Sequence, residues 1–238
     1  MKENNLIKAI LFDVDGVLVD SEPVMEKAWT KVLSLYGVSL SHEVYNTYIG
    51  MTDTTFLENV EKAYAVPLFP YRKEIFHKLY EVYCQKDLAV SPIQGVKEFI
   101  ALAKNSHLLV ALATSAPRVK LMKNLSSIGY TEQDFDCVVN GDHVEKSKPD
   151  PEIYLLAAKK LGCHIEDCLV IEDSQNGVIS GHRSGATVLA FTTSLDDGIL
   201  YQSGADIVTT DYTSLLSFSG ITEMNRMIEK RILKKKTV

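Results

Sequence analysis

The sequence predicts an α/β protein: an open parallel sheet with helices on both faces, and one inserted helical domain. Two observations support this fold class. From Pro92 onward, short apolar runs alternate with segments of helical periodicity, the pattern of right-handed βαβ units. Between Ser21 and Ser91, β-branched runs nearly disappear and helical spacing dominates. We therefore expect a core of residues 1–20 and 92–238, with residues 21–91 as a helical cap.

The first predicted strand is the apolar run from Ala9 to Phe12. A short run that is apolar throughout is typical of a strand buried on both faces, as in a parallel sheet. The chain then continues into Asp13 and Asp15, followed by Gly16. Carboxylates are seldom buried unless they are paired, hydrogen-bonded or bound to a cation. We interpret the two aspartates as site residues, the alternative being an acidic turn.

Three helices are expected in the inserted segment. The first contains Val24 and Leu35 and stops before Gly37, and Pro67 and Pro70 separate the other two. Those two helices span Thr54–Ala63 and Tyr71–Tyr83.

After the cap, strands and helices alternate in the manner of a Rossmann-like sheet. Strands are expected at His107–Ala113, Phe135–Val139, Cys168–Ile171, Thr187–Phe191 and Ile207–Val208. Helices are expected at Gly95–Lys104, Pro117–Ile128, Pro151–Leu161 and Ser174–Arg183, with a last helix beginning near Tyr212.

Composition narrows the class of protein. Of the 238 residues, 46% are hydrophobic and 24% charged, which is ordinary for a globular protein, and the net charge of −6 argues against a nucleic-acid partner. The sequence has no secretory signal and no apolar span of 18 residues, so no membrane partner is expected. Its four cysteines form no CxxC pair, which favours reduced thiols in the cytoplasm. A monomer is the default expectation.

Polar residues follow several of the predicted strands. Thr114 and Ser115 follow the second strand, and Glu172 and Asp173 follow the fourth. Lys148 lies in the loop that opens the helix at Pro151–Leu161. Ligands of open α/β sheets bind beyond the carboxyl ends of the strands, so these side chains are expected to converge with the two aspartates.

This set of residues suits phosphoryl transfer. Clustered carboxylates need a cation, and oxygen ligands suit Mg²⁺, which commonly shares a substrate phosphate. One carboxylate can attack phosphorus, while a second protonates the leaving oxygen and later activates water. Lysine and hydroxyl donors can hold the phosphate oxygens as charge develops.

Four segments carry a resemblance to a known family: FDVDGVLVDS, LATSA, KSKPDPEIY and IEDSQNG. In this order they resemble the four motifs of the haloacid dehalogenase (HAD) superfamily. The similarity is closest to the subgroup with a helical cap after the first strand, which includes β-phosphoglucomutase and many small phosphatases.

The resemblance implies a role for each motif residue. Asp13 would be the nucleophile, and Asp15 the general acid/base. Thr114 and the backbone of Ser115 would bind the phosphoryl group, which Lys148 would neutralise. Two simpler roles remain open: Thr114 as a helix N-cap, and Lys148 as a solvated loop charge.

The resemblance also implies a metal site. Mg²⁺ would take the carboxylate of Asp13, the backbone carbonyl of Asp15 and the carboxylate of Asp173. Glu172 would be either a further ligand or a neighbour of the ligands. Ser174 is interpreted equally well as the N-cap of the following helix.

Three activities of the family compete, and residues of the first motif and of the cap decide among them. Asp15 argues against a dehalogenase, which has no leaving alkoxide to protonate. A phosphoglucomutase would carry cationic cap residues where this chain has Met25, Ile49 and Asp53, aligned on the first motif and on Gly50. We therefore predict phosphomonoester hydrolysis through an aspartyl-phosphate.

A mutase remains the alternative, with a cap cation supplied instead by Arg72, Lys73 or His77. A more remote alternative is a phosphometabolite-binding protein without turnover. Gly50 and Asp53 are the predicted cap residues that meet the substrate. The acidic Asp53 favours a hydroxylated or neutral leaving group, such as a sugar or polyol, over a second phosphate.

Overall fold

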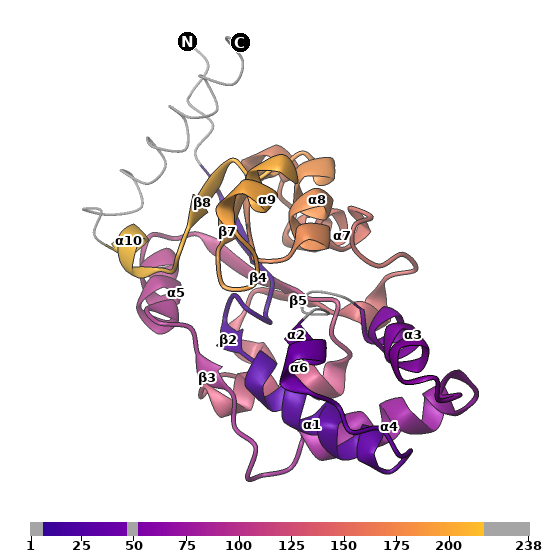
Figure 1. The fold of residues 1–238 in the computed structure, drawn as a ribbon. Helices are drawn as coiled ribbons and strands as arrows, with labels where there is room; N and C mark the ends of the chain where they lie inside the picture. Colours follow the sequence, from indigo (N-terminus) through magenta and orange to yellow (C-terminus); the bar gives the residue numbers. More distant parts are fainter. Residues whose placement is uncertain (1–6, 47–51, 217–238) are drawn as a thin grey trace, which may run out of the picture. The chain divides into compact units, whose positions relative to one another are not determined.

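The computed structural model describes residues 7–46 and 52–216, and it divides into two compact units. Residues 1–20 and 92–238 form the first, called here the core unit, and residues 21–91 form the second, the helical unit. Figure 1 shows the main sheet in the core unit and mostly helices in the described part of the helical unit.

The core unit contains a six-stranded sheet of order β5-β4-β1-β6-β7-β8, in which every pair is parallel. The predicted open parallel sheet is therefore confirmed. The strands are β1 (Ala9–Phe12), β4 (Leu109–Ala113), β5 (Cys137–Val139), β6 (Cys168–Glu172), β7 (Thr187–Phe191) and β8 (Ile207–Thr209). A separate two-stranded sheet pairs β2 (Val19–Asp20) with β3 (Ser91–Pro92).

The helices of the core unit alternate with these strands along the chain. They are α5 (Val96–Asn105), α6 (Arg118–Ser127), α7 (Glu152–Leu161), α8 (Gln175–Ser184), α9 (Asp197–Gln202) and α10 (Thr213–Leu216). Short 3₁₀ turns are η2 (Glu132–Asp134), η3 (Gly141–His143) and η4 (Ile165–Asp167).

Ser174 caps α8, as predicted, because its side chain accepts a hydrogen bond from the amide of Gly177. Within the described residues, no helix has the length and apolar character to cross a membrane.

The structure departs from the sequence prediction at one strand start and at one helix for local reasons. The strand expected at His107 begins at Leu109, because His107 has a φ of 60° and its amide donates to the carbonyl of Lys104, extending the turn that ends α5. Helix α9 was not predicted, since its six residues are too few to display a clear apolar period.

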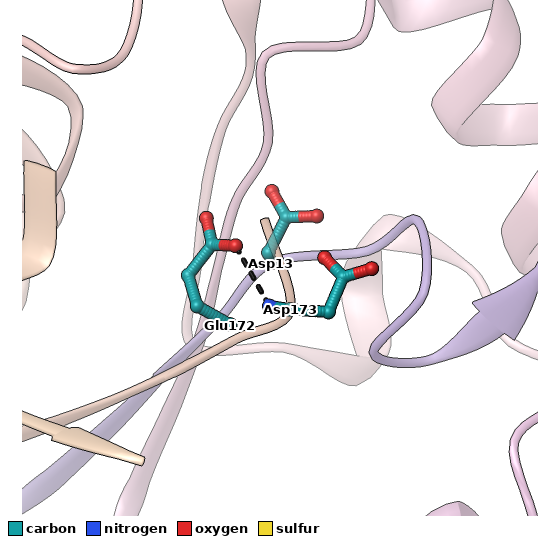
Figure 2. Close-up of side chains that lie close together, drawn as sticks. All are labelled: Asp13, Glu172 and Asp173. Atoms are coloured by element: carbon teal, nitrogen blue, oxygen red, sulfur yellow. Dashed lines mark hydrogen bonds between the residues drawn. The ribbon is translucent and has the colours of Figure 1, made fainter. Parts of the chain in front are cut away.

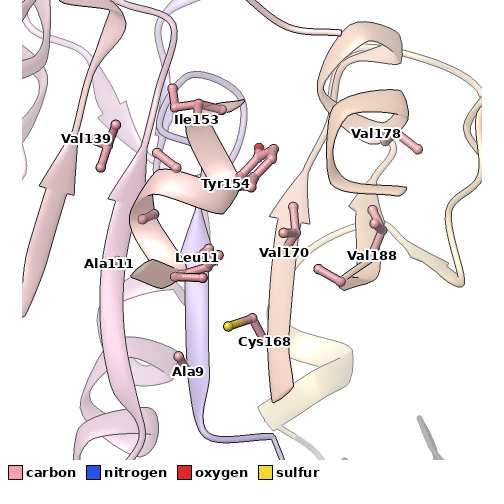
Figure 3. Packing of buried hydrophobic residues seen from close by; sticks show 14 of the residues in the cluster. Ala9, Leu11, Ala111, Val139, Ile153, Tyr154, Cys168, Val170, Val178 and Val188 are labelled. Atoms are coloured by element: carbon pink, nitrogen blue, oxygen red, sulfur yellow. The ribbon is translucent and has the colours of Figure 1, made fainter. Parts of the chain in front are cut away.

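One face of the sheet packs against α7 and α8 (Figure 3). Alternate residues of each strand point to this face because side chains of a strand alternate between its two sides. The strand residues in this cluster include Ala9, Leu11, Ala111, Val139, Cys168, Val170 and Val188. Ile153, Tyr154 and Val178 meet them from the two helices.

The opposite face carries an aromatic cluster. The Tyr212 ring lies 4.6 Å from the ring of Phe191 and 4.9 Å from the ring of Phe99, measured between centroids. Phe12 at the end of β1 contacts both Phe99 and Tyr212. This cluster and the α7–α8 layer together bury both sides of β1, as its uniformly apolar sequence predicts.

The described part of the helical unit contains α1 (Glu22–Ser34), α2 (His42–Asn46), α3 (Asp53–Tyr64), η1 (Phe69–Tyr71) and α4 (Arg72–Tyr83). Helix α1 packs against α4, and Trp29 of α1 contacts Phe56 of α3 in a tilted arrangement with ring centroids 4.6 Å apart. The three predicted helices of this segment are present, whereas the short α2 was not predicted.

The strand order places two strand ends side by side. Connections from β1 lead to β4 and β5 on one side, while β6, on the other side of β1, leads to β7 and β8. The order in which strands are added to the sheet therefore reverses between β1 and β6. Open α/β sheets bind ligands at such a point. Phe12 pairs in register with Ile171, so Asp13 and Glu172 follow at neighbouring positions.

Two buried tyrosines give a test of this packing. Tyr154 and Tyr212 are both fully buried, and Tyr154 donates a hydrogen bond to Glu172 whereas the hydroxyl of Tyr212 has no partner among the described residues. Tyr154→Phe should lower the free energy of unfolding by about 2 kcal/mol, and Tyr212→Phe should raise it by about 1 kcal/mol, because only the second removes an unsatisfied group. Urea unfolding of both variants measures this difference, and a change of the same sign in both would contradict it.

Candidate active site

A buried lysine lies at the carboxyl edge of the sheet. The Nζ of Lys148 is 2.5 Å from Asp13 Oδ1 and 2.6 Å from Glu172 Oε1, and it donates to the carbonyl of Ala113 at 3.0 Å. Only 8% of Lys148 is exposed. The interpretation of Lys148 as a solvated loop charge is therefore wrong: its three donors bind the ends of β1, β4 and β6.

Three carboxylates gather around this lysine. One carboxylate oxygen from each of Asp13, Glu172 and Asp173 lies within 4.8 Å of the others, and all three residues are buried. In the view of Figure 2, the side chain of Asp13 lies between those of Glu172 and Asp173. The dashed line in Figure 2 is the hydrogen bond of 2.9 Å from the Asp173 amide to Glu172 Oε2.

Burial and the charge of Lys148 shift the pKa values of this cluster in opposite directions. It raises the pKa of Asp13 to about 7 against the opposing charge of Lys148. Burial also raises the pKa of Asp173 well above its ordinary value, and the charges of Glu172 and Asp13 add to the shift. For Glu172, burial is outweighed by the charge and hydrogen bond of Lys148, so its pKa is lowered. The cluster thus resists carrying three negative charges.

Glu172 is saturated with hydrogen-bond donors. Its Oε1 accepts from Lys148 and from the Tyr154 hydroxyl at 2.7 Å. Its Oε2 accepts from the amides of Asp173 and Ser174 and from the Ser174 hydroxyl. A carboxylate offers about four lone-pair sites. Glu172 therefore orients the lysine and the turn after β6, with little capacity left for another partner.

A glycine brings the loop after β1 against this cluster. Gly16 has a φ of 70°, and a Cβ at this position would lie 1.8 Å from Asp173 Oδ2. Its amide closes a tight turn by donating to the carbonyl of Val19 at 2.8 Å. Only glycine satisfies both demands, so the peptide between Asp15 and Gly16 lies beside Asp173.

Thr114 and Ser115 stand at the end of β4. Thr114 is 1% exposed, and its hydroxyl accepts a hydrogen bond from the Ala116 amide at 3.1 Å. Helix α6 has Pro117 as its N-cap and no side-chain cap, so Thr114 does not cap it and that simpler role is wrong. Ser115 is exposed beside it.

The predicted cap residues belong to the helical unit. Asp53 begins α3 in the helical unit, where the Tyr80 hydroxyl donates to its carboxylate. Its role toward a substrate stays a prediction. Gly50 and Ile49 lie outside the described residues.

Two residues at the site were missed from the sequence. The hydroxyls of Thr193 and Ser194 both donate to Asp173 Oδ2, that of Thr193 at 3.3 Å, and the Thr193 hydroxyl also contacts the carbonyl of Gly16 at 2.7 Å. They follow the end of β7. The rule that identified the other strand ends would have found them had it been applied to this strand as well.

Comparison with known proteins identifies the family. The model of the haloacid dehalogenase-like hydrolases matches residues 10–191, a span that contains Asp13, Lys148 and Asp173. The chain belongs to this family. The resemblance drawn from the four motifs is thereby confirmed.

Curated relatives include phosphatases. The phosphorylated carbohydrates phosphatase of Thermotoga maritima is 32% identical over 203 residues, which cover 84% of this chain and 92% of the relative. Hexitol phosphatase B of Escherichia coli is 34% identical over 179 residues, covering 73% and 78%. The prediction of a phosphatase-type hydrolase is confirmed at this level.

One further relative is much longer than this chain, and one solved structure resembles it in fold. The Arabidopsis thaliana protein SUPPRESSOR OF QUENCHING 1, chloroplastic, is 33% identical over 208 residues, but this chain spans only 20% of its length. The crystal structure of β-phosphoglucomutase from Clostridium difficile matches with a TM-score of 0.78 over 96% of this chain and all of that one. At 18% identity, this second match supports the fold alone.

Two glycines test the packing of Glu172. A Cβ on Gly177 of α8 would lie 1.8 Å from Glu172 Oε1, whereas a Cβ on Gly198 of α9 would meet no atom within 4 Å. Gly177→Ala should lower the free energy of unfolding by about 2–3 kcal/mol through overpacking. Gly198→Ala should instead raise it by about 0.5 kcal/mol, since alanine restricts the unfolded chain. Chemical denaturation compares the pair, and equal effects would refute the close approach of Gly177 to Glu172.

Proposed function

We propose that this protein is a Mg²⁺-dependent phosphatase of small phosphorylated metabolites, sugar or polyol phosphates, acting through an aspartyl-phosphate on Asp13. The observation that carries the proposal is the contact of the buried Lys148 with both Asp13 and Glu172 at the carboxyl edge of the sheet. A carboxylate held against a buried ammonium group can approach a phosphate dianion whose charge that same group offsets.

The first step uses Asp13 as the nucleophile. Its oxygen attacks phosphorus while the ester bond to the leaving oxygen breaks, and Asp15 gives a proton to that oxygen. Lys148 holds Asp13 by Oδ1 and supplies positive charge near the transferring group. The Thr114 hydroxyl and the Ser115 amide are the proposed donors to the phosphoryl oxygens.

The second step returns the enzyme to its starting state. Asp15, now ionised, removes a proton from water, which attacks phosphorus and releases phosphate from Asp13. The Asp15 side chain is 25% exposed, so it can reach both the leaving group and water. The phosphoryl group is thus transferred to water, and Asp15 regains the proton that it gave to the alcohol.

The acid cluster fits a divalent cation. Its donors are carboxylate oxygens, which suit Mg²⁺, and a cation there would favour the ionised forms of Asp13 and Asp173 that burial disfavours. When bound, Mg²⁺ would neutralise phosphoryl oxygens in the transition state. We propose Asp13, Asp173 and the backbone carbonyl of Asp15 as its protein ligands. Glu172, whose oxygens already accept five donors, would neighbour the ligands.

The substrate class rests on two supports. Relatives named for phosphorylated carbohydrates and for hexitols share about a third of their residues with this chain over most of its length. The acidic Asp53 in the helical unit disfavours a second phosphate on the substrate. We also propose a cytoplasmic location, which suits the four free cysteines.

The nucleophile is tested by Asp13→Asn. Phosphate release from p-nitrophenyl phosphate should fall at least about 1,000-fold, because an amide cannot form the aspartyl-phosphate. The circular dichroism spectrum should stay that of the wild type, since Lys148 keeps Glu172 as a partner. Activity that survives in a folded Asp13→Asn protein would remove Asp13 from this role.

Metal binding is tested without turnover. Adding Mg²⁺ to the EDTA-treated protein should raise its Tm, because binding to the folded state alone stabilises it. Asp173→Asn should abolish most of that increase, and Asp87→Asn, at an exposed aspartate, should preserve it. If Mg²⁺ does not raise the Tm of the wild type, the site is contradicted. The same holds if Mg²⁺ raises the Tm of Asp173→Asn as much as that of the wild type.

The substrate class is tested on a panel of glucose 6-phosphate, mannitol 1-phosphate and glycerol 3-phosphate with Mg²⁺. We expect phosphate release from at least one of them. For the mutase alternative, the protein is incubated with β-glucose 1-phosphate and a trace of the bisphosphate. Formation of glucose 6-phosphate without free phosphate would favour the mutase. No turnover of any ester would favour a binding protein.

A further inference from the structure

Two side chains of α6 bind both oxygens of Asp15. The Nζ of Lys120 lies 3.1 Å from Asp15 Oδ2, and the side-chain amide of Asn124 donates to Asp15 Oδ1 at 3.0 Å. Lys120 and Asn124 are four residues apart, so they project from the same face of the helix. The four motifs include neither residue.

The surroundings set these contacts apart from a surface ion pair. Asn124 is fully buried, and the side chain of Lys120 is only 13% exposed. A buried amide and a largely buried ammonium group are costly unless they are satisfied, so their placement against one carboxylate constrains that carboxylate. An exposed pair would leave Asp15 free to change rotamer at little cost.

Helix α6 also has a fixed relation to the proposed phosphate donors. It begins at Arg118, directly after the Thr114–Pro117 turn that ends β4. The backbone that carries the proposed phosphoryl-binding groups therefore continues into the helix that holds Asp15. A rigid helix links the two groups that must act on opposite ends of the breaking bond.

We propose that Lys120 and Asn124 are positioning residues for Asp15, holding its carboxyl group in line with the leaving oxygen. This inference rests on the proposed phosphatase function. In the first step the Asp15 proton passes to the leaving oxygen, and the carboxylate left behind is paired with the Lys120 ammonium. In the second step the same carboxylate takes a proton from water. Asn124 holds the Asp15 carboxyl group in one orientation through both steps.

Leaving-group dependence separates positioning from a structural role. For each ester, kcat/KM reports the step in which the alcohol leaves. A sugar or polyol must be protonated as it leaves, whereas p-nitrophenolate leaves without that help. Lys120→Met should lower kcat/KM about 10- to 100-fold for the best panel ester and less than about 3-fold for p-nitrophenyl phosphate. Lys120→Arg, which keeps the charge, should restore most of the loss.

A second variant and a control complete the experiment. Asn124→Leu, which keeps the approximate shape without the donor, should show the same selective loss, so the test does not depend on one variant folding. Lys97→Met, at an exposed lysine of α5, should leave both substrates unaffected. Thermal unfolding of each variant shows whether the protein is folded at the assay temperature.

The outcomes distinguish this inference from the function on which it rests. A selective loss in Lys120→Met and Asn124→Leu, with recovery in Lys120→Arg, supports positioning. Equal loss for both esters, no loss, or no recovery with arginine would overturn it while the wild type remains a phosphatase. A wild type that releases no phosphate from any ester would overturn the proposed function itself.

Discussion

The ammonium group of Lys148 between Asp13 and Glu172 is the interaction around which the core unit is arranged. A buried charge is tolerated only with partners, and removal of one partner from such a pair costs about 3–5 kcal/mol. Lys148 has two carboxylates and the carbonyl of Ala113, contributed by three adjacent strands. Lys148 therefore holds the ends of these three strands in a fixed arrangement, which requires the strands to be in their observed register.

Small and polar residues then adapt to this buried charge. Gly16 and Gly177 leave space against Asp173 and Glu172, where any Cβ would collide. Tyr154 and Ser174 donate to Glu172, and Ser194 donates to Asp173. The packing of α7 and α8 on the sheet and the chemistry of its edge are thus coupled, because Tyr154 belongs to the apolar cluster and to the acid cluster at once.

Much of this arrangement was predictable because it is local or follows from topology. Uniformly apolar β1 predicts a central strand, and the rule that ligands bind beyond strand ends gathers Asp13, Lys148 and Asp173 without any coordinates. The prediction failed where a short element lacks a period, as in α9, or where one residue has an unusual φ, as at His107. Lys120 and Asn124 gave no signal, because their function depends on the face that α6 turns toward Asp15.

The sequence by itself determined the fold class, the family and the residues of the four motifs, since periodicity, strand ends and motif order are all carried by neighbours along the chain. Only the tertiary structure decided how those residues are partnered. In the folded chain, Lys148 contacts two carboxylates, and the oxygens of Glu172 accept five donors. Lys120 and Asn124 contact the carboxylate of Asp15. Lys148 and Glu172 are 24 positions apart, and Asn124 and Asp15 are 109 positions apart. Such contacts depend on helix rotation and strand register, which a linear pattern does not encode.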